Sequence, residues 1–374
     1  MFFSNLHNNH TKKTILTAPL DWGLGHATRC IPIIKELNAS GNKVIIAAGG
    51  PIKNLLQAEF PDNSFIDLPG YKIKYSQSAF WLPLKLMLQV PGTILSILRE
   101  HSWLKKAIKE YHIDIVISDN RFGLFNKNIF SIYITHQLAI KTGNLLLNIL
   151  ASRIHQWFIK KYNECWVPDF KNDAVAGELS HPDIKPTNVK YIGCLSRFEK
   201  TIKEEKIYDL LAVISGPEPQ RTIFENIILK QVTDFAGKIL LIRGLPGNED
   251  IYKNKQELKQ NIVLKNYVKG QELALLIQQS ELVICRSGYS SVMDLIKLQQ
   301  KAILVPTPGQ SEQVYLADYL LQKKMFYSVK QEHLVLERVI SEAKKFMYKI
   351  PDFDMNEYAG MIIEINSVQH MGKL

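Results

Sequence analysis

The stretch VICRSGYSSVMDLIKLQQKAILVPTPGQSEQVYLADYL, from Val283 to Leu320, contains the most informative pattern of the chain. An apolar run predicts a strand that ends at Cys285, and the turn after it, Ser287 and Gly288, lets the backbone approach a ligand closely. A helix is expected from Ser290 and Ser291 onward, and its free N–H groups suit a diphosphate. A second apolar run ends in a Pro/Gly turn that carries Gln310, Ser311, Glu312 and Gln313.

The same alternation of short β-rich runs and helical stretches continues through both halves of the chain. The β-rich runs are 13–20, 43–50, 64–70, 114–120 and 129–136 in the first half, and 210–216, 238–244, 261–268, 281–288 and 301–309 in the second. This alternation predicts two doubly wound, Rossmann-like α/β domains that face a cleft. The expected domains are 1–198 and 209–350, joined by a charged linker at 198–208, and residues 351–374 are expected to form a helix that returns toward the first domain.

A second glycine-containing junction lies near the N-terminus, in TAPLDWGLGHATRCIPIIKEL from Thr17 to Leu37. Gly23 and Gly25 stand where the first strand becomes a helix and let the backbone pass close to a ligand. His26 follows at the helix start, where the helix dipole disfavours imidazolium. We therefore expect a neutral His26 that faces the cleft and can accept a proton.

The pattern C-R-S-G-x-x-[ST]-x-x-[DE], followed by V-P and a Gln-containing turn, resembles the nucleotide-sugar site of GT-B glycosyltransferases. The likeness is greatest to the lipid-linked GlcNAc transferases of peptidoglycan synthesis and their relatives, family 28 among them, whose Gly-rich loop with His is similar to the GLGH of this chain. The resemblance implies that Asp294, where the family usually has Glu, binds the ribose of UDP. It also implies that Gln313 contacts the donor sugar, with Gln310 and Glu312 as further candidates.

Other strand ends fit the same resemblance. Relatives end the first strand of the donor domain as this chain does at Ser215 and Gly216, and they touch the nucleotide where it has Arg243 and Gly244. A surface charge is the alternative interpretation for both Arg243 and Arg286. Arg286, inside the motif, either contacts the ligand or pairs with a neighbouring acid and shapes the loop. Asp119 ends a strand of the first half and either orients His26 or caps the next helix. His136 ends another strand, and a structural role is the favoured interpretation for it.

Composition limits the class of protein. The chain has 374 residues, 46% of them hydrophobic, and a formal net charge of +10, which favours anionic partners. Its four cysteines are far apart and form no CxxC pair, so a reducing compartment is expected and zinc is not. The sequence predicts no signal peptide and no transmembrane span, and no basic-aromatic module for nucleic acid is visible. We expect a cytoplasmic protein, with peripheral contact on the inner face of an anionic membrane as one possibility.

The segment 80–112 is apolar with interspersed Lys and Arg. One interpretation is a core helix preceded by a loop. The other is an edge of the acceptor site that contacts a membrane, because lipid-acceptor relatives carry an apolar, basic-flanked patch in their first domain. The sequence leaves both open.

Together these features predict an inverting, metal-independent glycosyltransferase that moves a sugar, GlcNAc by resemblance, from a UDP-sugar to an acceptor hydroxyl. His26 is the expected base and Asp119 its partner. No metal cofactor is expected, because no carboxylate pair stands at a strand end of the donor domain. A UDP-sugar epimerase and a non-catalytic UDP-sugar-binding protein on the same scaffold remain alternatives. The sequence does not identify the acceptor.

Overall fold

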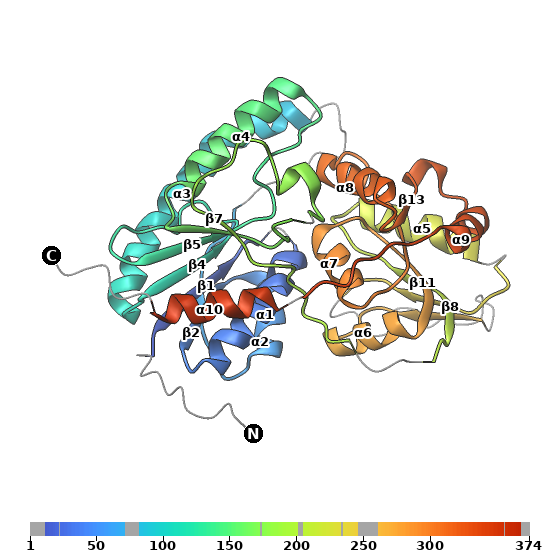
Figure 1. Cartoon of the computed structure of the whole chain (residues 1–374), viewed down its shortest axis with the longest axis horizontal. Helices are drawn as coiled ribbons and strands as arrows, with labels where there is room; N and C mark the ends of the chain where they lie inside the picture. The colour runs from blue at the N-terminus through green and yellow to red at the C-terminus, as the bar shows by residue number, and fades with distance from the viewer. Residues whose placement is uncertain are drawn as a thin grey trace.

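The computed structural model describes residues 12–21, 23–71, 82–172, 174–200, 205–232, 235–245, 261–354 and 356–367, of which 82–91 are described only as helix. The chain forms two α/β lobes, each built on one parallel sheet (Figure 1). The predicted fold, two doubly wound Rossmann-like domains, is confirmed. No helix in the described part of the chain is long and apolar enough to cross a bilayer.

The first sheet has seven parallel strands in the order β3-β2-β1-β4-β5-β6-β7. Its helices connect successive strands, as parallel pairing requires. The strands are β1 (Thr14–Pro19), β2 (Lys43–Ala48), β3 (Ser64–Asp67), β4 (Ile115–Asp119), β5 (Phe130–Ile134), β6 (Glu164–Val167) and β7 (Val189–Tyr191), and the α-helices are α1 (Leu24–Ala39), α2 (Gly50–Glu59), α3 (Leu82–Tyr111) and α4 (Leu145–Ile159).

The second sheet has six parallel strands in the order β10-β9-β8-β11-β12-β13. The sequence did not indicate β13, which has two residues. The strands are β8 (Tyr208–Val213), β9 (Ile239–Ile242), β10 (Ile262–Lys265), β11 (Ser280–Cys285), β12 (Ala302–Leu304) and β13 (Tyr327–Ser328), and the α-helices are α5 (Gln220–Val232), α6 (Gly270–Gln278), α7 (Tyr289–Lys297), α8 (Ser311–Gln322), α9 (Leu336–Lys345) and α10 (Glu357–Ser367).

Each sheet reverses its strand order at one point, between β1 and β4 in the first and between β8 and β11 in the second. Loops leave the two neighbouring strands in opposite directions there, so a crevice opens at the carboxyl ends of the strands. The Gly23–Gly25 loop and Asp119 lie at the first of these points, and Gly216 and the loop after Cys285 lie at the second.

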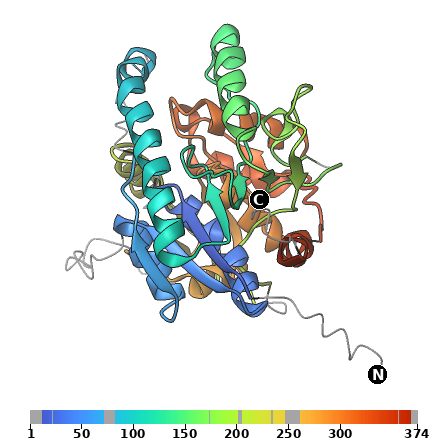
Figure 2. The same ribbon diagram turned by 90° about the vertical axis from the view of Figure 1, so that its left-hand side faces the viewer.

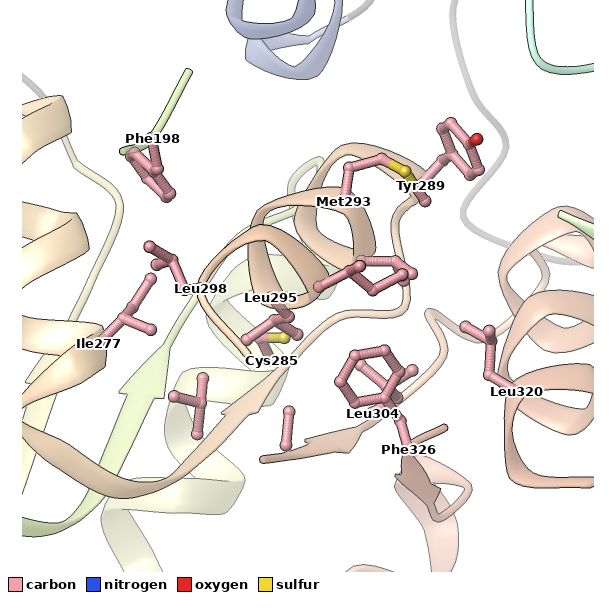
Figure 3. Close-up of a cluster of buried hydrophobic side chains, with 14 of the residues drawn as sticks. Phe198, Ile277, Cys285, Tyr289, Met293, Leu295, Leu298, Leu304, Leu320 and Phe326 are labelled. Carbon is pink, nitrogen blue, oxygen red and sulfur yellow. The ribbon is translucent and has the colours of Figure 1, made fainter. Parts of the chain in front are cut away.

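A large apolar core holds α7 against the second sheet. Met293 and Leu295 of α7 pack with Cys285 of β11 and Leu304 of β12, as Figure 3 shows. Phe198, which is 2% exposed, belongs to the same core although it precedes β8. The N-terminus of α7 is therefore fixed rigidly in front of the sheet.

The last helix, α10, crosses back to the first domain and packs along α1 (Figure 1). Ile362 and Ile365 are 0% and 1% exposed and belong to the apolar core formed by α1 and the first sheet. The neighbouring Ile363 points outward and is 57% exposed. The chain thus passes between the domains twice.

This packing predicts different costs for two neighbouring substitutions. Ile362→Ala should lower the free energy of unfolding by about 2–5 kcal/mol, because it removes a fully buried side chain. Ile363→Ala, the matched control, should change it by about 0.5 kcal/mol or less. Denaturant unfolding of both variants measures the difference, and equal values would show that α10 does not stabilise the first domain.

Candidate active site between the two domains

His26 and Asp119 meet at the carboxyl end of the first sheet. Asp119 is the last residue of β4 and pairs in register with Pro19 at the end of β1, while His26 lies in the first turn of α1, just after the loop that leaves β1. His26 Nδ1 lies 3.0 Å from Asp119 Oδ2. The Asp119 side chain is 0% exposed and that of His26 is 18% exposed, so the imidazole is the part that a ligand can reach.

Arg29, one turn after His26, sets the charge state of this pair. It donates from Nε to Asp119 Oδ1 at 2.9 Å, and its Nη2 contacts the same oxygen. Burial would raise the pKa of Asp119, but Arg29 and His26 outweigh burial and hold this pKa below its usual value. Burial and the Arg29 cation together lower the pKa of His26. The arrangement is a carboxylate beside a neutral imidazole, which is what a general base requires.

The network continues across the cleft to the second domain. Arg29 Nη1 lies 3.0 Å from His136 Nδ1, and His136 Nε2 lies 2.8 Å from Glu312 Oε1 in the first turn of α8. The His136 ring also stacks on Tyr289 at the start of α7, with centroids 4.1 Å apart and planes 2° from parallel. The structure therefore places His136 in the interdomain network that includes His26 and Asp119.

The N-termini of α1 and α7 face each other at close range. Ser290 Oγ donates to the Gly25 carbonyl at 3.1 Å, and a Cβ on Gly25 would lie 3.0 Å from that hydroxyl. Gly23 has a φ of 124°, in the region that favours glycine. The two glycines thus serve different needs, a backbone turn at Gly23 and close approach at Gly25. Ser291 lies beside Ser290 in the first turn of α7.

Asp294 lies one turn further along α7 and contacts the segment that leads out of the first domain. Its Oδ1 accepts a hydrogen bond from Ser196 Oγ at 2.6 Å. Burial raises the pKa of Asp294 to about 6, against the opposing effects of Arg197 and the Ser196 hydrogen bond. No sequence pattern indicates Ser196, because its role depends on how the two domains dock.

Arg286, the arginine of the C-R-S-G motif, connects segments that follow β8, β12 and β13. The Arg286 side chain is buried and donates to the carbonyls of Val305, Pro306 and Gln220 and to Gln331. Its guanidinium lies 4.1 Å from the centroid of the Phe224 ring, and burial lowers its pKa to about 10. The ligand contact suggested for Arg286 stays a prediction. The alternative, pairing with a neighbouring acid, is not found among the described residues. Carbonyl oxygens and one amide take that place.

The turns after β8 and β9 place Gly216 and Gly244 at the carboxyl edge of the second sheet, beside Ser215 and Arg243. Gly244 has a φ of 68°, and a Cβ there would lie 2.5 Å from the Ile214 carbonyl oxygen, so only glycine fits. Arg243 is bound to Glu225 and, at 3.0 Å, to Asn266. Arg243 is thus already held in an ion pair beside the turn.

Three buried polar atoms near these turns have no hydrogen-bond partner among the described residues: Gln220 Oε1, Arg286 Nε and Thr307 Oγ1. Arg286 contacts the Gln220 carbonyl, and Thr307 lies 3.9 Å from the Cβ position of Gly216, so these residues surround one region. Buried groups of this kind are normally satisfied, and a polar ligand is one way to do so.

The glutamine turn is held by its own side chains. Gln313 accepts from the Thr307 N–H at 2.9 Å and donates to Gln310 Oε1 at 2.5 Å, while Ser287 Oγ donates to the Gln313 carbonyl at 2.8 Å. Beside this turn lies an open cavity of about 540 Å³. It lies between the domains, lined by Lys141, Gly143, Leu145 and Asn148 from the first and Gly309, Ser311, Val314 and Tyr315 from the second.

Comparison with known proteins agrees with this geometry. Residues 211–362 match the glycosyltransferase family 28 C-terminal domain. The chain is a GT-B glycosyltransferase whose second domain is similar to that of family 28.

The relatives match different shares of the chain. An uncharacterized glycosyltransferase of Methanosarcina mazei is 24% identical over 359 residues, which are 88% of this chain and 90% of that protein. A UDP-N-acetylglucosamine–N-acetylmuramyl-(pentapeptide) pyrophosphoryl-undecaprenol N-acetylglucosamine transferase of Exiguobacterium sibiricum is 26% identical over 140 residues, 36% of this chain and 38% of that protein. In fold, the glycosyltransferase is similar to the kitacinnamycin glycotransferase, with a TM-score of 0.63, 14% identity and coverage of 95% and 94% of the two chains.

Most predicted site residues of the glycosyltransferase lie along the two facing edges, but they do not form one cluster. His26, Asp119 and Glu312 share the network that Arg29 and His136 complete. Ser290 and Asp294 contact the first domain, and Arg243 and Arg286 are held within the second. In the part of the chain that is described, no three His, Cys, Asp or Glu side chains gather as a metal site.

Proposed function

We propose that this glycosyltransferase moves GlcNAc from UDP-GlcNAc to the hydroxyl of a membrane-embedded acceptor, with inversion and without a metal ion. The contact between His26 and Asp119 carries this proposal, because it supplies one activated base at the edge of the cleft. The relative from Exiguobacterium sibiricum supports the donor by its name.

The base acts in a single displacement. His26 donates from Nδ1 to the Asp119 carboxylate, which leaves the Nε2 lone pair free. Nε2 takes the proton of the acceptor hydroxyl as its oxygen bonds to the anomeric carbon. The bond from that carbon to the diphosphate breaks on the opposite face, so the configuration inverts. The protonated imidazole is stabilised by Asp119.

The donor belongs to the second domain. Asp294 accepts hydrogen bonds from the ribose hydroxyls, and the first turn of α7, which has no acidic residue, faces the diphosphate. Gln310 and Gln313 hold the sugar beside the cavity. The unpaired Thr307 hydroxyl and Gln220 amide oxygen are available to the nucleotide. In this arrangement Ser196 gives up Asp294 when the ribose binds.

Asp294 predicts a loss of nucleotide binding on substitution. Asp294→Asn should weaken UDP binding by about 10- to 100-fold, which corresponds to about 1.5–3 kcal/mol for a charged hydrogen bond. Asp318→Asn, an exposed acid on α8, is the matched control and should bind UDP normally. Calorimetric titration measures both, and wild-type affinity in Asp294→Asn would rule out the ribose contact.

The raised pKa of Asp294 adds a pH dependence. Only the carboxylate accepts hydrogen bonds from both ribose hydroxyls, so UDP affinity should increase as the pH rises through about 6. UDP itself loses a proton in this range, so the relevant quantity is the difference between the wild type and Asp294→Asn.

The base predicts a large and selective loss of turnover. His26→Ala should reduce kcat by about 10²- to 10⁴-fold and leave UDP affinity nearly unchanged. Asp119→Asn should also reduce kcat, and the double variant should lose far less than the product of the two, since the residues act as a unit. The exposed His333→Ala is the control. Retained turnover in His26→Ala would make His26 a structural residue.

The proposed metal independence is supported by the N-terminus of α7, which can stabilise the departing diphosphate as a cation does. Transfer from UDP-GlcNAc should therefore persist in EDTA at the same rate. A donor screen with UDP-, TDP- and GDP-sugars in EDTA, read as released nucleotide, measures both the donor and the metal requirement. Complete loss in EDTA that Mg²⁺ or Mn²⁺ restores would contradict this part of the proposal.

A membrane acceptor is supported by an exposed apolar surface on α3 and α4. Among the described residues, these helices carry ten large apolar side chains that are more than 40% exposed: Ile94, Leu95, Leu98, Leu145, Leu146, Leu147, Ile149, Leu150, Ile154 and Trp157. Both helices project to the same side of the molecule (Figure 2). The exposed cations Arg153, Lys160 and Lys161 on or just after α4 suit anionic headgroups.

The surface leads to the cavity, because Leu145 at the start of α4 also lines it. An acceptor with its apolar part in the bilayer can thus present its hydroxyl end between the domains. Of the segment 80–112, residues 80 and 81 and the side chains up to 91 lie outside the described residues. The exposed side chains of α4 were not expected from the sequence.

Membrane contact predicts a charge-sensitive association. The wild type should float with vesicles of anionic lipid, and Leu146→Glu with Leu150→Glu should reduce the bound fraction at least about tenfold, since each places a charge in an apolar interface. Met347→Glu is the control, because Met347 is 69% exposed and lies outside α3 and α4. Equal flotation of all three proteins would remove the membrane from the proposal.

A further inference from the structure

We propose that Arg29 and His136 are positioning residues that connect Glu312, at the start of α8 in the second domain, to His26. Through them Glu312 helps to fix the orientation of the His26 imidazole and the nitrogen that carries its proton. This inference rests on the proposed function for its effect on turnover. Its structural part, the arrangement of protons in the network, stands on the contacts alone.

The proton on His136 is fixed by its two partners. Glu312 is a carboxylate and can only accept, so the contact of 2.8 Å requires a proton on His136 Nε2. Arg29 can only donate, so the contact of 3.0 Å requires a lone pair on His136 Nδ1. A neutral His136 satisfies both contacts in one tautomer. His136 therefore donates to the Glu312 carboxylate and accepts from the Arg29 guanidinium, so that the two charged groups are connected through one imidazole.

The proton on His26 follows from the burial of Asp119. His26 Nδ1 lies 3.0 Å from Asp119 Oδ2 and 2.9 Å from Arg29 Nη2, so it could donate to the first or accept from the second. Arg29 already donates to Asp119 Oδ1. Apart from His26, the described contact of Asp119 Oδ2 is the Cys30 thiol, at 3.8 Å. A fully buried carboxylate oxygen needs a stronger donor than a thiol. The proton is thus on Nδ1, and Nε2 is free to act as base.

Arg29 has two effects on the base. It fixes Asp119 Oδ1, so that Oδ2 points to His26, and its charge keeps the imidazole neutral. His136 holds the other end of the guanidinium, and Glu312 holds His136. The charged and titratable groups that act on His26 are Arg29 from α1, Asp119 from β4, His136 after β5 and Glu312 from α8, while the Cys30 thiol contacts Asp119. Of these, only Glu312 comes from the donor domain.

The first test is a nitrogen NMR titration of the imidazoles in the full-length protein, with signals assigned through His26→Gln and His136→Gln. The wild type should show a protonated Nδ1 for His26 and a protonated Nε2 for His136. Arg29→Met should raise the pKa of His26, because it removes a neighbouring cation. Lys35→Gln, which removes an exposed charge from the same helix, is the control. A protonated Nε2 on His26 in the wild type, or no change in Arg29→Met, would overturn the proposal.

Arg29→Met leaves Asp119 buried without its cation, which can prevent folding. Variants at the other end of the network avoid this problem. Glu312→Ala should alter the His136 nitrogen signals, and Glu312→Gln, whose amide oxygen can still accept, should largely preserve them. Unchanged His136 signals in Glu312→Ala would refute the connection between the domains.

Turnover provides the second test. His136→Ala should lower kcat by about 10- to 100-fold, as small displacements of catalytic groups do, and His136→Gln should recover part of it. In Arg29→Met the rising limb of the pH profile should move to higher pH, so that loss is greatest at low pH. A loss that is equal at every pH would mean a merely structural role. Because the NMR experiment needs no substrate, its result separates a failure of this inference from a failure of the proposed function.

Discussion

The buried carboxylate of Asp119 is the group on which the active-site edge depends. It is 0% exposed, yet it stands where β4 ends beside β1, so it must be satisfied by side chains. Arg29 and His26, one turn apart on α1, supply the donors. A single buried charge thus fixes the rotation of α1 about its axis, and with it the direction in which His26 faces. The loop with Gly23 and Gly25 lets the chain turn sharply enough to bring that helix into place.

The two domains meet through polar contacts between fixed elements. Ser290 binds the Gly25 carbonyl, Ser196 binds Asp294, and Glu312 binds His136. Ser290 and Glu312 lie in the first turns of α7 and α8, and Asp294 lies one turn further along α7; their partners lie at the carboxyl edge of the first sheet or in the segment that follows it. Such contacts are specific in geometry but modest in net free energy, so ligands can replace them. The cleft therefore combines a defined alignment with access for a donor.

The fold could be predicted from the sequence because the strands are short apolar runs that end in Gly or polar residues. The same logic located His26, Asp119 and the 285–294 region, since strand ends and helix starts converge at a switch point. What it missed depends on packing between distant segments. For Arg286 the sequence left a ligand contact and a loop-shaping role open, and its burial on Phe224 and its hydrogen bonds to three carbonyls depend on packing that the sequence does not show. Ser196 gains its partner when the two domains dock, and Arg29 gains its partners when α1 packs on the first sheet. The apolar run of α4 has the composition of a core helix, and periodicity does not tell which of its faces stays uncovered.

The return of α10 to the first domain has a mechanical meaning. The chain crosses between the domains on the way out near Gly193 and on the way back near Glu357, and these points touch, since a Cβ on Gly193 would lie 3.1 Å from that of Glu357. Close by, Phe170 and Phe353 pack with ring centroids 3.8 Å apart. The two covalent connections between the domains thus lie side by side at one place. Elsewhere the domains are held together by noncovalent contacts, such as those of Ser290, Asp294 and Glu312.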